Sequence, residues 1–335
     1  MKIQFDASQP YQLAAINAAV ALFAGLPHER AGEHSGGVGR HDTRFDSPFD
    51  VGGLWSEVGI GNAMPLTDTA LLANLHAVQE VNGIAKSDAL ALLGQAIDAD
   101  GAGESNPSLH SGRTAAGASD LNGAAYAQDA GHALPPFANF SIEMETGTGK
   151  TYVYLRTIFE LHRTHGFSKF IIVVPSVAIR EGVKTSLRLM REHFRALYDN
   201  VAYDEWVYDS RQVSRVRAFA MSASLQIMVM NIDAFRKSEN VIMKENDRLS
   251  GRRPIEFVRA TRPVVILDEP QNMESDAAKA AIASLAPLCT LRYSATHRHA
   301  YNLIYRLDPV AAYDLKLVKR IEVDSIIDQP SFNEP

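Results

Sequence analysis

Short apolar segments alternate with helical patterns through the chain after residue 136, and this alternation constrains the fold more than any other feature. The segments predict strands over Phe140–Met144, Lys169–Val174, Val201–Tyr208, Leu225–Met230, Val264–Leu267 and Thr290–Ser294. Helices are predicted from Lys150 to about His165, from about Ala178 to Leu197 and over about Ser275–Leu285. Uninterrupted apolar strands between helices are typical of a sheet buried on both faces. We therefore predict an α/β fold, a mainly parallel sheet covered by helices on both faces.

The region from residue 28 to residue 135 differs from the rest and is predicted to be a long insertion. The helix predicted before it, over residues 9–24, ends at Gly25. After the insertion the regular alternation begins. We therefore predict one domain, made of residues 1–27 and 136–335 and interrupted by 28–135.

Within the insertion the pattern changes twice. Residues 28–64 have no hydrophobic period and are predicted to be loop. Residues 67–98 are predicted to be helical in two pieces, Thr67 to about Val81 and Ser87 to Ile97, each opened by a capping residue. Residues 101–135 contain too few large apolar side chains to offset the entropy of ordering, so we expect a flexible, partly disordered loop.

The composition excludes several classes of protein. A net charge of −6 excludes a globally basic nucleic-acid binder, although a local basic groove stays compatible with it. The single cysteine, Cys289, precludes an intrachain disulfide. No stretch approaches the roughly 20 apolar residues that span a bilayer, and the N-terminus lacks the apolar region of a signal peptide. We expect a cytoplasmic protein with no membrane contact.

The segment Met144–Thr151 follows a predicted strand and precedes a predicted helix, which is the layout of a phosphate-binding loop. Its glycines let backbone N–H groups close around phosphates, and the helix N-terminus adds the positive end of its dipole. Lys150 can reach the β- and γ-phosphates, and the Thr151 hydroxyl can bind Mg²⁺. Met144 stands where the full motif has its first glycine, so only the second half is matched. Read alone, Gly-Lys-Thr also fits an ordinary turn before a helix.

An acidic pair, Asp268 and Glu269, follows the apolar strand Val264–Leu267 directly. A carboxylate at this place can hold Mg²⁺, and its neighbour can orient or deprotonate an attacking water, as in a P-loop NTPase. We assign Asp268 to the metal and Glu269 to the water. The alternative is a pair of acidic residues that cap the next helix.

Two further polar segments also follow predicted strands. Pro175–Arg180 opens a helix whose free N–H groups, with Ser176 and Arg180, suit a phosphate. The same helix face carries Lys184, Arg188 and Arg191. A solvated amphipathic helix would explain this pattern equally well. The second segment, Ser294–His297, would be an ordinary turn if read alone. All these segments fall at strand ends, where α/β sheets bind their ligands.

Together these motifs resemble the first RecA-like domain of superfamily 2 helicases and translocases. Their order in the chain is Pro10-Tyr11-Gln12, then Thr146–Thr151, Pro175–Arg180, Asp268-Glu269-Pro270-Gln271 and Ser294-Ala295-Thr296. The wording of Met144–Tyr152, Lys169–Pro175, Asp268–Gln271, Tyr301–Leu307 and Leu317–Arg320 is similar to the Res subunit of type III restriction–modification enzymes. The likeness covers about residues 1–25 and 136–325. The segment Ala77–Ile84, within the insertion, also looks like this family.

The resemblance implies a role for each matching residue. Gln12 would read the adenine edge of ATP. Phosphates and Mg²⁺ would be held by Thr146, Gly147, Thr148, Gly149, Lys150 and Thr151, while Lys150, Asp268 and Glu269 would serve hydrolysis. Gln271, Ser294 and Thr296 would couple hydrolysis to DNA, whose backbone would contact Ser176, Arg180 and Asn231. The implied partners are double-stranded DNA and a modification (methyltransferase) subunit.

The resemblance also raises an expectation about extent. After residue 325 we find no second RecA-like domain, no arginine finger and no nuclease signature, so we expect a truncated fragment that is weak or inactive alone. Two alternatives stay open. A stand-alone P-loop NTPase or small-molecule kinase would need a lid, for which Arg211, Arg215 and Arg217 are candidates. A non-enzymatic remnant is the other.

Overall fold

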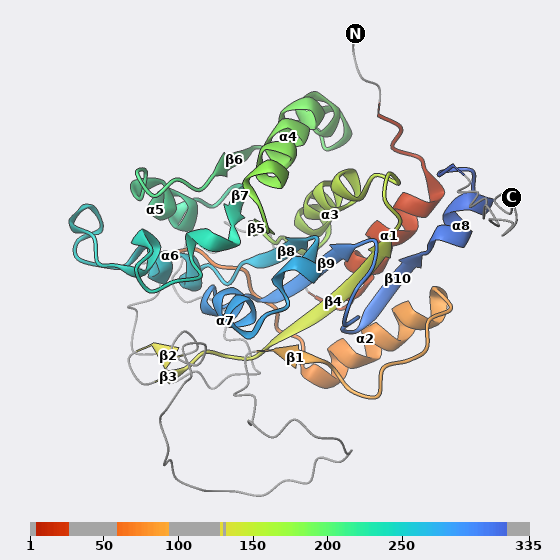
Figure 1. The fold of residues 1–335 in the computed structure, drawn as a ribbon, viewed down its shortest axis with the longest axis horizontal. Helices are drawn as coiled ribbons and strands as arrows, with labels where there is room; N and C mark the ends of the chain where they lie inside the picture. Colours follow the sequence, from red (N-terminus) through yellow and green to blue (C-terminus); the bar gives the residue numbers. More distant parts are fainter. Residues whose placement is uncertain (1–4, 27–58, 94–127, 130–131, 320–335) are drawn as a thin grey trace, which may run out of the picture.

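The central element is an eight-stranded sheet. The structure, a computed structural model, describes residues 5–26, 59–93, 128–129 and 132–319 (Figure 1). The strands of the sheet are β1 (Leu92–Leu93), β4 (Phe137–Met144), β5 (Lys169–Val174), β6 (Tyr203–Val207), β7 (Leu225–Asn231), β8 (Val264–Asp268), β9 (Cys289–Ser294) and β10 (Leu303–Leu307). Their order is β1-β4-β9-β8-β5-β7-β6, with β10 also paired to β4. Every pair is parallel except β1 with β4, so the predicted mainly parallel sheet is confirmed.

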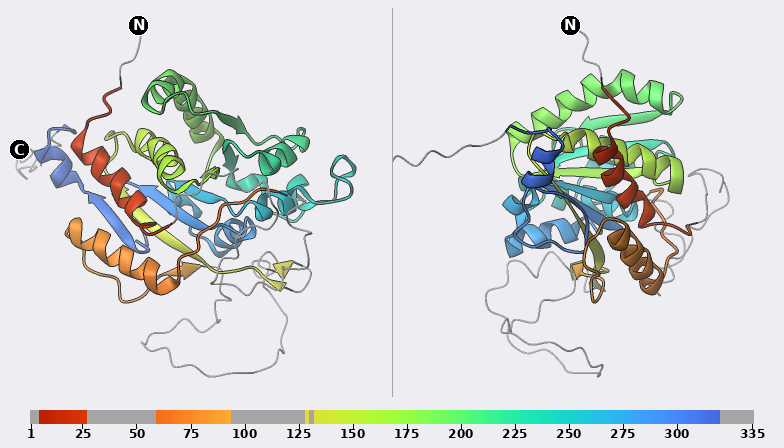
Figure 2. Two further views of the ribbon diagram at one scale, coloured as in Figure 1. Left: turned by 180° about the vertical axis from the view of Figure 1, so that it is seen from behind. Right: turned by 90° about the vertical axis from the view of Figure 1, so that its right-hand side faces the viewer.

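Helices cover both faces of the sheet, as predicted. One face packs against α1 (Pro10–Ala21), α2 (Asp68–Val81), α3 (Lys150–His165) and α4 (Val177–Leu197). The other packs against α5 (Ser214–Met221), α6 (Pro254–Ala260) and α7 (Asp276–Ser284), and the layers are visible from the side in Figure 2. Along β5, Phe170 and Ile172 enter the first core while Ile171 and Val173 enter the second. Burial on both faces explains why the strand is apolar at every position.

The helix predicted over Ser87–Ile97 is wrong where the structure describes it. Leu92 and Leu93 form β1, antiparallel to the start of β4, and residues 94–97 lie outside the described part. Asn302 holds the approach to β1, because its side chain bonds both the N–H and the C=O of Ala91. Pairing at the sheet edge thus overrides a local helical pattern.

The other helix of the predicted insertion, α2, belongs to the main core. Leu71, Leu75 and Val78 are buried there together with residues of α1 and α3. Gln79 and Asn82 donate to the carbonyls of Leu303 and Ile304 on β10 at 3.0 and 2.9 Å. These side chains cover backbone groups of an edge strand that would otherwise be open to another chain. The loop predicted over 101–135 falls mostly outside the described residues. Of that range the structure describes β2 (Gln128–Asp129), its antiparallel partner β3 (His132–Ala133) and residues 134–135.

Among the described helices, none combines the length and the apolar composition of a membrane span.

Lys169, the first residue of β5, is a charged residue whose side chain is fully buried. Its ammonium group donates to the carbonyls of Phe219, at 2.7 Å, and Ser222, at the C-terminal end of α5. Although these carbonyls favour the charged form, burial dominates and lowers the pKa of Lys169 to about 7.

Lys169 is therefore expected to make folding depend on pH. Its pKa in the folded state lies below the unfolded value, so the buried charge opposes folding below about pH 7, and this cost disappears as the pH rises toward 10. The wild type should gain stability over Lys169→Met through that range, by at most about 1.4 kcal/mol per pH unit. Urea unfolding at several pH values measures the difference. Lys86→Met, at an exposed lysine, serves as the control, and a Lys169→Met difference that is flat with pH would contradict the prediction.

Candidate nucleotide site and its surroundings

Three of the predicted segments meet at one edge of the sheet. The loop Met144–Thr151 follows β4, the acidic pair ends β8, and Ser294 ends β9, which lies between β8 and β4. Glu143 of β4 is in register with Ser294, and Asp268 with Tyr293. Because these strands are parallel, their carboxyl ends share an edge, which is where α/β sheets bind ligands.

The glycine loop has the backbone that a phosphate cradle needs. Gly147 and Gly149 have φ angles of 82° and 91°, in the left-handed region that favours glycine. A Cβ atom built on Gly149 would lie 2.6 Å from the side-chain nitrogen of Gln12, so the backbone conformation favours glycine and any larger residue would displace the Gln12 amide. Helix α3 begins at the next residue, Lys150, and directs its free N–H groups toward the loop. These residues therefore fit a nucleotide phosphate, although the motif is only half matched in sequence.

Gln12 reaches this loop from a distant part of the chain. It lies in the first turn of α1, and its amide donates to the carbonyl of Thr148 at 3.1 Å. The two residues are 136 positions apart, so the folding of the intervening chain brings Gln12 next to the glycine loop. Its predicted contact with adenine stays a prediction, whereas its contact with the loop is direct.

Lys150 and Glu269 form an ion pair across the site. The ammonium group of Lys150 lies 3.0 Å from Oε1 of Glu269, and the two side chains are 11% and 27% exposed. Glu269 is not glycine, yet its φ of 53° and ψ of 55° lie in the left-handed region. Such a backbone costs about 1–2 kcal/mol and persists where its surroundings hold it. Here its N–H donates to the carbonyl of Tyr293 on β9.

A continuous set of hydrogen bonds runs from Glu269 to the end of β9. The amide of Gln271 donates to Oε2 of Glu269 at 2.6 Å. The hydroxyl of Ser294 lies 2.7 Å from Oε1 of Gln271 and 2.6 Å from the carbonyl of Thr296, and it accepts from the Thr296 N–H at 3.1 Å. The structure therefore brings Gln271, Ser294 and Thr296 together, and it joins them to the Lys150–Glu269 pair.

Asp268 is buried beside this pair. Burial, and then the negative charge of Glu269, raise the pKa of Asp268 to about 6, while Lys150 and a hydrogen bond from the Tyr154 hydroxyl oppose the shift. The Tyr154 oxygen lies 3.3 Å from Oδ2 of Asp268. Burial also raises the pKa of Tyr154, so this hydroxyl stays a donor. Tyr154 also bonds the side chain of Thr151, so the Asp268 carboxylate and the Thr151 hydroxyl lie beside one phenol, and both are oxygen groups that could hold Mg²⁺.

Binding of Mg²⁺ to Asp268 should therefore compete with protonation of its carboxylate near pH 6. Below its pKa of about 6, metal binding must displace that proton, so Mg²⁺ affinity should fall about tenfold per pH unit. The carboxyl carbon shift of Asp268, followed by NMR against pH, should titrate near pH 6, and its midpoint should fall when Mg²⁺ and a nucleotide are added. Tyr154→Phe removes a donor and should raise the midpoint. A midpoint near 4 in the wild type would contradict the assignment.

The residues predicted to contact DNA lie at the same edge of the sheet, where β5 leads into α4 and β7 ends. Ser176 caps α4 with its hydroxyl, which accepts from the N–H of Ile179, and Asn231 caps the turn after β7 by accepting from Asp233. Val174 and Asn231 are in register, so the two caps lie side by side. Arg180 is one turn further along α4, where it pairs with Glu181 at 3.1 Å. These three residues thus lie beyond β8, apart from the glycine loop.

Sequence reasoning missed two contributors to the site. Tyr154 lies one turn after Lys150 on α3, a spacing that brings both to one helix face, and this signal was available in the sequence. Glu145 accepts from the N–H of Thr146 at 2.7 Å, and its carbonyl accepts from the Thr148 hydroxyl at 2.6 Å. No local pattern marks Glu145, because its role depends on how the loop turns back on itself.

Comparison with known proteins assigns these motifs to a family. The model of the family described as "Type III restriction enzyme, res subunit" matches residues 125–299, just over half of the chain. Among curated proteins, the chain is 29% identical to the EcoP15I Res subunit of Escherichia coli over 60% of its own length and 23% of that protein. It is 32% identical to the StyLTI Res subunit of Salmonella typhimurium over 48% of its length and 18% of that protein. The aligned part is thus less than a quarter of either relative.

Solved structures give only a low likeness. The helicase MrfA bound to DNA and AMPPNP matches 51% of this chain and 25% of that chain, with 13% identity and a TM-score of 0.35. The type ISP restriction–modification enzyme LlaGI, a nuclease-deletion mutant with a DNA substrate mimic, matches 53% of this chain and 18% of that chain, with 12% identity and a TM-score of 0.33. Likeness at this level does not bear on function.

Proposed function

This chain belongs to the family of type III restriction enzyme res subunits, and from that membership we propose that it is the ATP-binding, helicase-like motor domain of such an enzyme. One observation carries the proposal, the unbroken set of contacts from Lys150 through Glu269 and Gln271 to Ser294. An ordinary turn before a helix does not need such a connection. A motor does, because it must transmit the state of its nucleotide to the surface that holds DNA.

The glycine loop would hold ATP by its phosphates. The N–H groups at the start of α3 and the ammonium of Lys150 would face the β- and γ-phosphates, with Thr146, Gly147, Thr148 and Gly149 forming the loop. Gln12 would lie against the adenine, since its amide already bonds the loop at Thr148. Phosphate oxygens would compete with Glu269 for Lys150, which frees the carboxylate for its own role.

Thr151 and Asp268 would hold Mg²⁺, which when bound neutralises developing charge on the phosphates. Glu269 would orient the attacking water and take its proton. Its left-handed backbone and its bond from Gln271 keep the carboxylate directed at the glycine loop. Gln271 would then sense whether Glu269 faces Lys150 or water, and Ser294 would pass that state to the loop at Thr296.

Double-stranded DNA would bind along the same edge. Ser176 and Asn231 cap adjacent elements, and each presents a helix or turn N-terminus to a phosphate; Arg180 adds a cation beside them. Cleavage of DNA, and assembly with a modification (methyltransferase) subunit, belong to the proposal through the family alone. The chain spans less than a quarter of its curated relatives, and the contacts described for Lys150, Asp268 and Glu269 involve no arginine. Because these contacts hold no arginine to stabilise the transition state, we expect slow ATP turnover.

The kinase alternative finds no support in the position of its lid residues. Arg211 pairs with Asp209, and Arg215 stacks on Trp206, both beside β6. β6 lies five strand positions from β4, which at about 4.8 Å per strand is roughly 24 Å from the glycine loop. Arginines there are too far away to close over phosphates on that loop.

Coupling between nucleotide and DNA tests the proposal without requiring turnover. Mg²⁺ with a non-hydrolysable ATP analogue should change the affinity for a labelled duplex about five- to tenfold, as expected for a coupling free energy of about 1–1.4 kcal/mol. Ser294→Ala breaks the bond to Gln271 and should bring this ratio close to one, as measured by fluorescence anisotropy. Ser87→Ala, at a serine that bonds Gln79 far from the site, is the matched control.

Three outcomes bear on the proposal differently. If the chain binds neither nucleotide nor duplex, the motor assignment fails. If both bind but Ser294→Ala leaves the ratio unchanged, the assignment holds and only the pathway through Gln271 is wrong. If the chain binds nucleotide but the duplex neither binds nor changes the affinity for nucleotide, a stand-alone NTPase is favoured.

A further inference from the structure

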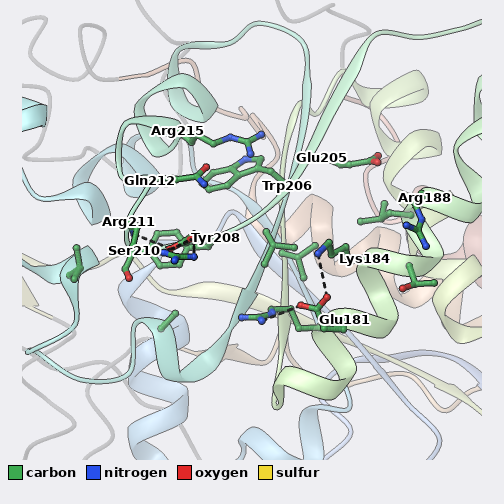
Figure 3. Close-up of a pocket in the computed structure, with 18 of the residues that line it drawn as sticks. Glu181, Lys184, Arg188, Glu205, Trp206, Tyr208, Ser210, Arg211, Gln212 and Arg215 are labelled. Carbon is green, nitrogen blue, oxygen red and sulfur yellow. Dashed lines mark hydrogen bonds and ion pairs between the residues drawn. The ribbon is translucent and has the colours of Figure 1, made fainter.

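The sheet ends at β6 in a groove with an open strand along its floor (Figure 3). Among the described strands β6 pairs with β7 alone. Residues of α4 form one wall, and residues 209–215, which lead into α5, form the other. The groove has a volume of about 1090 Å³, and its lining includes every residue from Glu205 to Gln212. The groove therefore follows the edge of the sheet and extends past the end of β7, where Val229, Ala234 and residues 239–241 complete its lining.

Backbone groups of β6 point into this groove. The N–H of Tyr208 donates to the carbonyl of Val229 on β7 at 2.9 Å. In a parallel pair, successive residues turn their peptide groups to opposite sides of the strand. Trp206 therefore faces β7 like Tyr208, whereas the N–H and C=O of Glu205 and Val207 face the groove. No described residue outside the sheet bonds these groups.

Two buried side-chain atoms beside the floor also have no partner among the described residues. They are Oε2 of Glu205 and the hydroxyl of Tyr208. The Glu205 side chain is 10% exposed and Tyr208 is 7% exposed, so water reaches them poorly. Arg191 pairs with the other oxygen of Glu205. Because both atoms are closed to solvent and the Tyr203 hydroxyl also bonds the Glu205 carboxylate, the unpaired backbone groups of the floor are what an occupant can reach.

The walls carry an excess of positive charge. Six cations line the groove, Arg180, Lys184, Arg188, Arg191, Arg211 and Arg215, against four carboxylates, Glu181, Glu205, Asp209 and Glu239. Most of these cations already pair with a carboxylate. Arg188 has no ion pair among the described residues, and the Arg211 side chain is 87% exposed. Acidic side chains of an occupant can reach both, although Arg211 would share its guanidinium with Asp209.

We propose that this groove docks an extended, acidic segment of a partner protein, which adds to the sheet as a strand alongside β6. A peptide brings alternating N–H and C=O groups that match those of Glu205 and Val207, and its acidic side chains can meet Arg188 and Arg211. A nucleic-acid backbone offers mainly acceptors, so it leaves the outward carbonyls of Glu205 and Val207 unbonded. The proposal does not involve the nucleotide site, since β6 lies at the other end of the sheet, but Arg180 belongs both to this groove and to the proposed DNA surface.

The test uses a fluorescein-labelled peptide that alternates glutamate with valine over the length of one strand. It should bind the full chain, and its version with alternate amides N-methylated should bind at least about tenfold more weakly, the loss expected for one backbone hydrogen bond. Peptide binding should also slow amide exchange at Glu205 and Val207. Equal binding of the N-methylated peptide, or no binding of the parent peptide, would overturn the proposal.

Two variants locate the site. Val207→Pro removes a groove-facing N–H without removing a bond to β7 and should weaken binding about tenfold. Arg188→Glu changes only an exposed wall and should weaken it at least about fivefold. Arg163→Glu, on α3 outside the groove, is the matched control. Should Val207→Pro disturb folding, Arg188→Glu and the exchange data decide alone.

Two other occupants have their own signatures. If oligothymidylate or a short duplex displaces the peptide and binds more tightly, with the same loss in Arg188→Glu, the groove is a nucleic-acid site and the proposal fails. If the chain forms dimers that Val207→Pro dissociates, the edge pairs with a second copy, and the proposal fails in that case too.

Discussion

Replacement of Lys150 by alanine is expected to lower the affinity for Mg²⁺-ATP by at least about 100-fold. The ammonium group lies 3.0 Å from Glu269 at the mouth of the glycine loop, and its side chain is mostly buried. Two charge-assisted hydrogen bonds to phosphate are worth about 1.5–3 kcal/mol each, which gives this factor. The substitution also leaves Glu269 without its counter-charge next to Asp268, so two carboxylates then oppose an anionic ligand.

Fluorescence titration with a labelled ATP analogue measures this loss, and thermal unfolding checks that the fold is intact. Lys184→Ala is the matched control, because Lys184 is an exposed lysine of α4 whose one ion pair within the described part of the chain is with Glu181. It should leave nucleotide affinity within about twofold. Equal affinities for wild type and Lys150→Ala would rule out the glycine loop as the phosphate site.

Glu269→Gln is expected to separate nucleotide binding from hydrolysis. The amide keeps the size of the side chain but cannot accept a proton, so turnover should fall by about 10²–10⁴, the usual contribution of a general base. Binding should be retained or improved, since a negative charge near the phosphates is removed. The loss of that charge should also lower the pKa of Asp268, which Glu269 raises.

Single-turnover experiments with the chain in excess over radiolabelled ATP make slow hydrolysis measurable. Glu181→Gln, at an exposed glutamate of α4, should behave as wild type. If Glu269→Gln loses binding and turnover in equal measure, Glu269 holds the nucleotide instead of activating water. If turnover is unchanged, the acidic pair is no more than a helix cap.

Local patterns predicted much of this fold because the strands are buried on both faces. The apolar pattern predicts β5, β7 and β8 within one residue, and it predicts the start of α3 at Lys150. The edge strands are harder to predict from the sequence. β1 contains only two residues, and its local sequence pattern predicts a helix. The pattern of Tyr301–Leu307 resembles a family segment but does not predict the strand β10. Short edge strands carry a weak local signal, since their pairing partners decide their conformation.

The nucleotide site also has one part that the sequence predicts and another part that only the tertiary structure shows. Motif order indicated that the segment after β4 and the one after β8 would meet, because parallel strands end at a common edge. The direct pair between Lys150 and Glu269 and the relay through Gln271 depend on the left-handed backbone at Glu269, which no pattern encodes. Tyr154, which bonds Asp268, was one helical turn from a residue already singled out.

By itself the sequence determined which segments would be buried, that the sheet would be mainly parallel, and which polar residues would lie at its ligand-binding edge. These properties follow from short-range periodicity and from the chemistry of each residue type. Only the tertiary structure decided that Gln12 touches Thr148 across 136 residues, that α2 covers β10, and that β6 is left open between basic walls. The physical reason is that such contacts depend on which distant elements pack together, and packing is a property of the whole chain.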